Sequence, residues 1–314
     1  MKASLLNILR CPSCRDSLTL DIEKECEGEI EKGNLTCTKC QSVYPILRCI
    51  PRFVATDKYL RSFSAQWTMF AKTQLDRTGK MDVSSGHTFK ETTGFDLSDL
   101  KNRWILEAGC GMGRFLDFVS REDSARVVGV DLSFAVEPAF ENVGRRRNVD
   151  IVQADIMHPP FSEKAFDIVY SIGVLHHTPN PKYALCSLTP LVQSGGEIAV
   201  WVYPKYNWTM FSDLYRRITW RLPWSMLLGV VKVMVTLHRL GPYLPSSLRK
   251  RLDLLVPISG QPDYEARVLD TYDWYSPKYQ FKSTEQDVTS WFTEAGLTKV
   301  ELLNAPVAIR AKVK

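Results

Sequence analysis

The sequence predicts an α/β protein that combines a largely parallel sheet, a small cysteine-rich module before it and a helical insertion within it. Three observations carry this prediction. Residues 104–106 form an apolar run that leads through Glu107 into a glycine-rich turn, two Cys-x-x-Cys pairs lie within residues 11–40, and residues 204–256 are both basic and apolar. A chain of 314 residues is long enough for one large domain and one small domain.

The glycine-rich turn is typical of a nucleotide site. The pattern Glu-x-Gly-x-Gly-x-Gly occupies residues 107–113, and a second apolar run, residues 126–130, ends in Asp131, 22 residues after Gly109. Glycines let a ligand approach the backbone, and a carboxylate after the second strand accepts hydrogen bonds from ribose hydroxyls. Position 114 is Arg rather than the third glycine of Gly-x-Gly-x-x-Gly, so the turn is poorly matched to a pyrophosphate.

This pattern resembles motif I of the class I S-adenosylmethionine (SAM) methyltransferases. Residues 149–156 resemble the third strand of that family and the acid near the adenine. Residues 165–181 resemble the fourth strand and following loop of its ubiquinone and menaquinone type, and residues 191–200 resemble its tight turn and fifth strand. The resemblance covers residues 104–203 and implies a Rossmann-like class I methyltransferase sheet, with SAM as the cofactor.

The resemblance also implies a role for individual residues. Glu107, Gly109, Cys110, Gly111 and Gly113 would hold the methionine part of SAM, Asp131 and Leu132 the ribose, Asp155 and Ile156 the adenine, and Ser171 and Val174 the sulfonium side.

The acceptor side has candidates for a general base. His176 and His177 follow the fourth strand, and His177 matches the family position better. Imidazole suits proton removal near neutral pH, although either histidine could instead cap the next helix. Tyr272, Asp273 and Tyr275 are second candidates, as substrate contacts, so the sequence does not fix the base.

The amino-terminal cysteines predict a zinc site. Cys11 and Cys14 form one knuckle, Cys37 and Cys40 form a second, and together they supply the tetrahedral sulfur set that suits Zn²⁺. Residues 5–54 resemble the Trm112-type zinc ribbon, a module often fused to or paired with methyltransferases. A closed four-sulfur site leaves no open position, so the zinc is expected to be structural; substrate or partner recognition by the ribbon is the functional alternative.

The predicted division is a ribbon domain at residues 1–54 and a methyltransferase domain at residues 55–314, with a helical lid inserted at 204–256. Apolar residues make up 45% and charged residues 24% of the chain, as in ordinary globular proteins. The amino-terminal apolar stretch is too short for a signal peptide. Eight cysteines without an export signal indicate a reducing compartment, so we expect a cytoplasmic protein. Peripheral attachment to the inner face of the membrane is the alternative location.

The insertion at 204–256 is strongly basic, whereas the rest of the chain is slightly acidic. It holds nine basic and two acidic residues, a net charge of +7, whereas the whole chain is +5, so the remainder sums to −2. Pro223 and Pro242 bracket a predicted helix. The insertion is interpreted as a lid packed on the protein, as a lid that also contacts a membrane surface, or as a nucleic-acid patch.

Flanking segments complete the predicted fold. Aromatic residues at helical spacing predict a helix over 59–70, and residues 73–93 read as a loop. Residues 283–296 predict a helix capped by Ser283 or Thr284, and residues 297–303 and 306–313 predict a final antiparallel hairpin.

These observations predict an enzyme, a SAM-dependent methyltransferase acting on an oxygen or carbon atom of a small or lipid-linked molecule. Residues 171–174 are Ser-Ile-Gly-Val rather than the Asn/Asp-Pro-Pro-aromatic sequence of base N-methylases. The alternatives are an rRNA or tRNA methyltransferase that grips RNA through the ribbon, and a non-enzymatic subunit that binds a partner. Residues 1–53 carry eight basic and seven acidic side chains, and zinc with four thiolates adds −2, so the ribbon is a poor match for phosphate and nucleic acid is not an expected partner.

Overall fold

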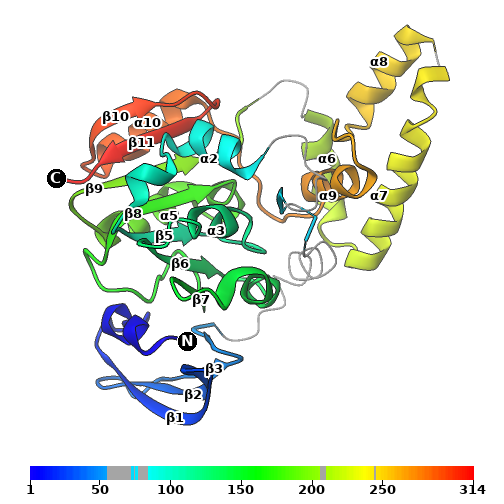
Figure 1. Ribbon diagram of the computed structural model, residues 1–314. Coiled ribbons are helices and arrows are strands. Elements are labelled where there is room, and N and C mark those ends of the chain that lie inside the picture. Colours follow the sequence, from blue (N-terminus) through cyan, green and yellow to red (C-terminus); the bar gives the residue numbers. More distant parts are fainter. Residues whose placement is uncertain (55–71, 74, 77–83, 206–209, 244) are drawn as a thin grey trace.

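A computed structural model describes residues 1–54, 72–73, 75–76, 84–205, 210–243 and 245–314, which form a four-stranded sheet, a seven-stranded sheet and their helices (Figure 1). The helix expected over residues 59–70 lies outside these described residues. The α/β class, the amino-terminal ribbon and the helical insertion are as the sequence predicts.

The small sheet is the predicted ribbon. After a 3₁₀ helix η1 (Ala3–Ile8), its antiparallel strands follow in chain order: β1 (Leu18–Cys26), β2 (Glu29–Cys37), β3 (Val43–Leu47) and β4 (Ile50–Pro51). The β1–β2 hairpin is largely exposed and acidic, since residues 21–32 hold six carboxylates and two lysines, a net charge of −4.

The large sheet has the order β10-β11-β9-β8-β5-β6-β7. Its strands are β5 (Trp104–Ala108), β6 (Arg126–Asp131), β7 (Val149–Gln153), β8 (Phe166–Ile172), β9 (Val192–Trp201), β10 (Thr298–Leu302) and β11 (Ala308–Lys312). Strands β5 to β9 are parallel, and β11 runs antiparallel to both β9 and β10, which is the predicted closing hairpin. The parallel strands are nearly continuous apolar runs because helices cover the sheet.

Helices flank the large sheet (Figure 1). They are α2 (Ser85–Thr93), η4 (Leu97–Leu100), α3 (Arg114–Val119), α4 (Val136–Ala139) continued by the π-helical η5 (Phe140–Gly144), η6 (Leu175–His177), α5 (Pro181–Leu188), η7 (Thr189–Leu191) and α10 (Glu285–Glu294). Thr284 caps α10 by accepting a hydrogen bond from the Asp287 N–H, as one of the two predicted caps.

The loop prediction for residues 73–93 is wrong where α2 lies. Ser84 caps this helix by accepting from the His87 N–H, and Gly94 ends it at a φ of 72°. The helix is held by tertiary packing, because the ring of Phe89 lies 5.5 Å from that of Phe118 and 5.2 Å from that of Tyr170. Only one large apolar residue marks α2 in the sequence, so its periodicity is weak.

The described residues of the insertion form the α-helices α6 (Met210–Thr219), α7 (Trp224–His238) and α8 (Ser246–Leu255), with the short η9 (Gly241–Tyr243) between the last two. We call residues 210–255 the helical arm. Helix α9 (Tyr264–Tyr275) leads back to the sheet and packs against α7. In Figure 1, α7 and α8 project beyond the sheet at the end of the molecule opposite the ribbon. Within the described ranges, no helix is long and apolar enough to cross a bilayer.

The ribbon covers the β7 edge of the large sheet. The Phe53 N–H donates to the Gln153 carbonyl (2.8 Å), and the Arg52 guanidinium donates to the Gln153 side chain (2.7 Å) and binds Glu137. An uncovered edge strand offers unpaired backbone groups to other chains. Buried side chains of the ribbon, Leu9 among them, join those of the large sheet in one apolar cluster, so the two sheets share a core.

Candidate active site and metal centre

A cavity of about 510 Å³ lies at the carboxyl ends of the parallel strands. Strand β5 pairs with β6 on one side and with β8 on the other, so the strand order reverses there. Open α/β sheets bind ligands at such switch points. The volume falls within the range of small-molecule sites, roughly 300–1,000 Å³.

The turn after β5 forms the floor of this cavity. Gly109 has a φ of 87°, and a Cβ at this position would lie 2.4 Å from the methyl carbons of Val174, so the position accepts only glycine. The N–H groups of Gly109 and Cys110 donate to the Val130 carbonyl at 2.7 and 3.0 Å. The turn is therefore fixed between β6 and the loop that follows β8.

Two of the acids in the cavity wall, Glu107 and Asp131, lie next to the glycine turn. Glu107 is 2% exposed and accepts from the Tyr170 hydroxyl (3.0 Å). Asp131 accepts from the Gly111 N–H (2.9 Å) and from the N–H and hydroxyl of Ser133 (2.8 and 2.7 Å). Loss of solvation raises the pKa of Asp131 and raises the pKa of Glu107 well above its usual range. A ligand that brings cationic groups and ribose hydroxyls, as SAM does, would restore the lost solvation, so the donor and acceptor set fits that cofactor.

His177 also lines the cavity, next to a backbone carbonyl and a carboxylate. Its Nδ1 is 3.0 Å from the Tyr279 carbonyl, and a carbonyl only accepts, so Nδ1 carries the proton and Nε2 the lone pair. Nε2 lies 4.0 Å from Asp273 Oδ2, which also accepts from the Tyr203 hydroxyl (3.0 Å). Loss of solvation lowers the pKa of His177, although Asp273 opposes this, so the imidazole is neutral at pH 7.

His176 is packed behind this wall. Its ring lies 3.9 Å from that of Tyr203 and 4.1 Å from that of His177, and it is fully buried. Among the described residues, neither of its ring nitrogens has a hydrogen-bond partner, and burial lowers its pKa well below the usual range. Of the two histidines, only His177 lines the cavity.

The structure brings most of the sequence-predicted residues to this cavity. Those that line it are Glu107, Gly109, Cys110, Gly111, Asp131, Leu132, Asp155, Ile156, Val174, His177 and Asp273. Gly113 and Ser171 do not line it: Gly113 is the N-cap of α3, and the Ser171 hydroxyl donates to the Ala108 carbonyl behind the wall.

Sequence reasoning missed part of the lining. Trp201, Tyr203, Leu269, Ser133 and Arg114 also face the cavity. Tyr203 and Trp201 come from the end of β9 and Leu269 from α9, so only tertiary structure joins them to the glycine turn. No described residue of 204–256 lines the cavity, and Leu269 and Asp273 of α9 contribute to its wall.

Tyr272 and Tyr275, two of the alternative substrate contacts, are absent from the cavity lining that the structure describes. Both are buried in the apolar cluster between α9 and α7. Burial raises the pKa of Tyr272 to about 12. Their packing on α7 favours a structural role, and Asp273 is the only one of these three that faces the cavity.

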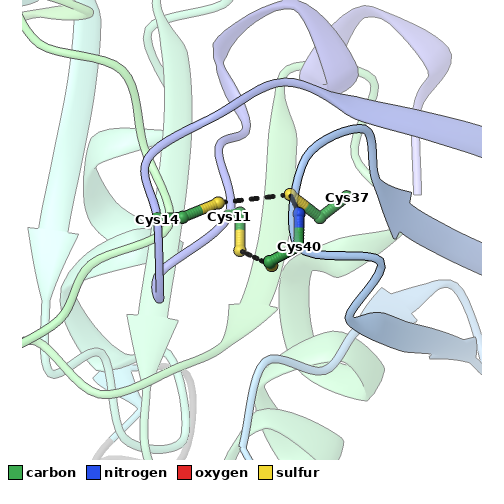
Figure 2. A group of neighbouring side chains, drawn as sticks. All are labelled: Cys11, Cys14, Cys37 and Cys40. Carbon is green, nitrogen blue, oxygen red and sulfur yellow. Dashed lines mark hydrogen bonds between the residues drawn. The ribbon is translucent and has the colours of Figure 1, made fainter.

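The four cysteines of the knuckles converge on one point of the ribbon, as Figure 2 shows. Their sulfur atoms all lie within 4.8 Å of one another, with Cys14 and Cys37 at 3.3 Å and Cys11 and Cys40 at 3.6 Å. Zinc–sulfur bonds of about 2.3 Å place tetrahedral sulfurs roughly 3.8 Å apart, so this donor set suits zinc. The other four cysteines do not take part in the cluster.

Comparisons with known proteins agree with the structure of both the large-sheet domain and the ribbon. The family model described as a methyltransferase domain matches residues 106–200, and the one described as Trm112p-like protein matches residues 2–47. The chain thus carries a class I SAM-dependent methyltransferase domain fused to a Trm112-like ribbon with a four-cysteine cluster.

Curated relatives are similar over a limited segment. The tRNA U34 carboxymethyltransferase of Shewanella loihica is 36% identical over 109 residues, which is 33% of this chain and 32% of that protein. The protein of the same name from Psychromonas ingrahamii is 33% identical over 108 residues, 33% of each chain. The similarity therefore spans about a third of the length of these relatives.

Solved structures are less similar. A complex of the Haloferax volcanii Trm112 methyltransferase activator with a putative methyltransferase has a TM-score of 0.46 at 11% identity, covering 77% of this chain and 79% of that one. Magnesium protoporphyrin IX methyltransferase from Synechocystis has a TM-score of 0.45 at 12% identity, covering 82% and 96%. With TM-scores below 0.5, these likenesses carry no functional inference.

We expect the purified protein to bind one zinc ion per chain, and a Cys37→Ser/Cys40→Ser variant to lose it. Because the ribbon shares a core with the large sheet, the variant should also unfold at a lower temperature, by roughly 2 °C for each kcal/mol lost. Elemental analysis and calorimetry measure the two effects. The matched control is Cys26→Ser/Cys186→Ser, at two exposed cysteines outside the cluster. A full zinc complement in the first variant would contradict the assignment.

We expect SAM and S-adenosylhomocysteine to bind at a single site, with affinity that depends on Asp131. Asp131→Ala removes a carboxylate that holds the glycine turn and faces the cavity, so binding should weaken by about 1–3 kcal/mol. Titration calorimetry measures this loss. Asp123→Ala, at an exposed turn outside the cavity lining, serves as the control. Equal affinity of Asp131→Ala and the wild type would remove Asp131 from the site.

Proposed function

We propose that the protein transfers a methyl group from SAM to an acceptor held beside His177. The observation that carries this proposal is that Glu107, the glycine turn, Asp131 and His177 converge on one cavity at the switch point of the sheet. The match of residues 106–200 to the methyltransferase domain supports the same reaction.

The cavity wall suggests how the chain would hold SAM. Asp131 would accept hydrogen bonds from the ribose hydroxyls, beside Leu132, and Asp155 with Ile156 would flank the adenine. Glu107, Gly109, Cys110 and Gly111 would surround the methionine part, and Val174 the sulfonium side. For Gly113 and Ser171 we propose supporting roles, since neither lines the cavity. Bound SAM supplies a methyl group on a sulfonium, which is transferred in line to the acceptor.

His177 is the general base in this proposal. Its proton on Nδ1 is held by the Tyr279 carbonyl, which leaves the lone pair of Nε2 for the acceptor proton. The Asp273 carboxylate, 4.0 Å away, would stabilise the imidazolium that forms, and Tyr203 holds that carboxylate in place. Asp273 is thus a positioning and electrostatic partner rather than a second base.

Two acceptor classes each have a supporting observation. The apolar surfaces of Trp201, Leu269 and Ile172 in the cavity wall suit the small or lipid-linked acceptor that the sequence analysis favours. The relatives named tRNA U34 carboxymethyltransferases support the RNA alternative more strongly, and they weaken the expectation that nucleic acid is not a partner. An RNA acceptor would be held away from the ribbon hairpin, whose net charge is −4.

For the ribbon we propose a structural zinc, and we retain the division into residues 1–54 and 55–314. The helical insertion 204–256 is retained as a unit of the second domain, although residues of α9 rather than its described residues line the cavity. The four sulfurs close the metal site, so the ribbon supplies no catalytic metal.

Label transfer tests the reaction and the acceptor together. The protein is incubated with methyl-labelled SAM and, separately, with total RNA and with a solvent extract of lipids and small molecules from cells that lack the gene. Label in the RNA supports the RNA acceptor, and label in the extract supports the small or lipid-linked acceptor. Mass spectrometry of the product distinguishes a methyl from a carboxymethyl group. No transfer to any fraction, with SAM binding intact, would contradict the proposed function.

We expect kcat/KM to decrease as the pH is lowered below neutrality, because His177 must be neutral to accept a proton. Burial lowers the pKa of His177 from its ordinary value of 6.5, so activity should persist at pH 6.5 and decline as the pH falls through the lowered pKa. His177→Asn retains a donor to the Tyr279 carbonyl but accepts no proton, and it should lose about 10²–10⁴-fold in kcat without loss of SAM affinity.

The control for this prediction is His87→Asn, at an exposed histidine on α2 that does not line the cavity. It should keep the activity and the pH profile of the wild type. An unchanged acid limb in His177→Asn would exclude His177 as the base.

A further inference from the structure

The helical arm presents an apolar face that the rest of the protein leaves uncovered. One side of α7 is buried against α9 through Leu227, Leu228, Val231 and Val235. On another side, Met226, Val230, Val233 and Leu237 are 56%, 43%, 58% and 59% exposed. Their spacing of four, three and four residues places them on one face over three helical turns.

Helix α8 also presents an exposed apolar face, and no side of it is buried against the rest of the described chain. None of its residues is buried, and Leu248, Leu252 and Leu255, at 45%, 41% and 42% exposure, share one face. His238 Nε2 lies 3.1 Å from Asp253 Oδ1, which joins α8 to the end of α7 by a polar contact. A ten-residue helix has little stability in water by itself, so these leucines need a surface to cover them.

The charges around these faces are basic. Arg217, Arg221, Lys232, Arg239, Arg249, Lys250 and Arg251 are exposed on the arm. Its two acids are already engaged: Asp213 lies 2.6 Å from both Arg216 and Lys282, and Asp253 lies between His238 and Arg249. Residues 210–255 carry a net charge of +6, and the seven exposed basic side chains are available to an anionic partner.

Aromatic residues mark the ends of α7. Trp224 at its start is 41% exposed, and Tyr243, just beyond its end, is 86% exposed. Trp220 lies under the guanidinium of Arg221, at 4.5 Å from the ring centroid. Tryptophan and tyrosine, with an apolar ring and a polar edge, are typical of segments at a membrane–water interface.

We propose that the helical arm docks on an anionic membrane surface, with α7 and α8 lying in the interface and their aliphatic faces in the lipid. Basic residues beside an aliphatic face are the two features that such binding needs. The arm does not span the bilayer, since no described helix is long and apolar enough. This docking is independent of the methyl-transfer proposal, because no described residue of the arm lines the cavity.

Charge and surface chemistry favour lipid over two other occupants. A second copy of the arm, residues 210–255, would bring a net charge of +6 against +6, and like charges in contact oppose association. RNA would use the arginines and lysines but would leave the exposed Val, Met and Leu side chains in water. An anionic bilayer accommodates both the charges and the aliphatic faces.

Vesicle flotation with the full chain tests the proposal. Vesicles of phosphatidylcholine alone or with phosphatidylglycerol are mixed with the protein at low and high salt and floated through a sucrose gradient. We expect the protein to float with the anionic vesicles at low salt and to float less at high salt, because exposed charges are screened over about 8–10 Å at physiological ionic strength.

Matched variants separate the aliphatic and ionic contributions. Val233→Glu on the arm is compared with Val43→Glu on the ribbon, since the two valines are 58% and 57% exposed. Arg251→Glu is compared with Arg147→Glu, another exposed arginine outside the arm. The arm variants should weaken vesicle binding on the order of tenfold, the controls should bind as the wild type does, and all four should retain SAM binding.

Three results would overturn the proposal. The first is protein that remains at the bottom of the gradient under all four conditions. The second is self-association in the absence of vesicles that Val233→Glu abolishes, which would identify a second copy as the occupant. The third is RNA binding that Arg251→Glu abolishes in a protein that does not float.

Discussion

The absence of a side chain at Gly109 is the constraint on which the cavity depends. A Cβ there would lie 2.4 Å from Val174, so any larger residue would push the loop after β8 away from the turn after β5. That loop carries His177, and the turn places Gly111 against Asp131. The missing side chain therefore lets the turn and the loop after β8 pack closely, so that the glycine turn and His177 line the same cavity.

The ribbon acts on the fold through an edge of the sheet rather than through the cavity. Its Phe53 and Arg52 continue the hydrogen bonding of β7, and its apolar residues merge with the core beneath the sheet. A module of this size buries little surface by itself, so the shared core stabilises it, and zinc bound by the four cysteines would add to this. In many proteins an edge strand is protected by charges or bulges; here a second small sheet serves this purpose.

Much of the site could be predicted from the sequence because its signals are local. The glycine turn, Asp131 and the cysteine knuckles are each defined within a few residues, so their spacing indicates their chemistry. The pairing of Tyr203 with Asp273 joins residues that are 70 positions apart, and no local pattern reveals it. The direction of a side chain is not local information either: Ser171 lies near the end of β8, and its hydroxyl donates to the Ala108 carbonyl behind the wall. Helix α2 escaped prediction because its stability comes from partners on other elements.

The acidic hairpin and the basic helical arm lie at opposite ends of the molecule (Figure 1). Such a separation gives the protein a large electric dipole moment. In the field of an anionic surface or polyanion, a dipole experiences a torque that turns its positive end toward the source. At physiological ionic strength this torque acts within about 8–10 Å of the surface, where the charges are not yet fully screened. Each encounter would therefore begin with the arm leading and the ribbon, with its cysteines, trailing on the far side.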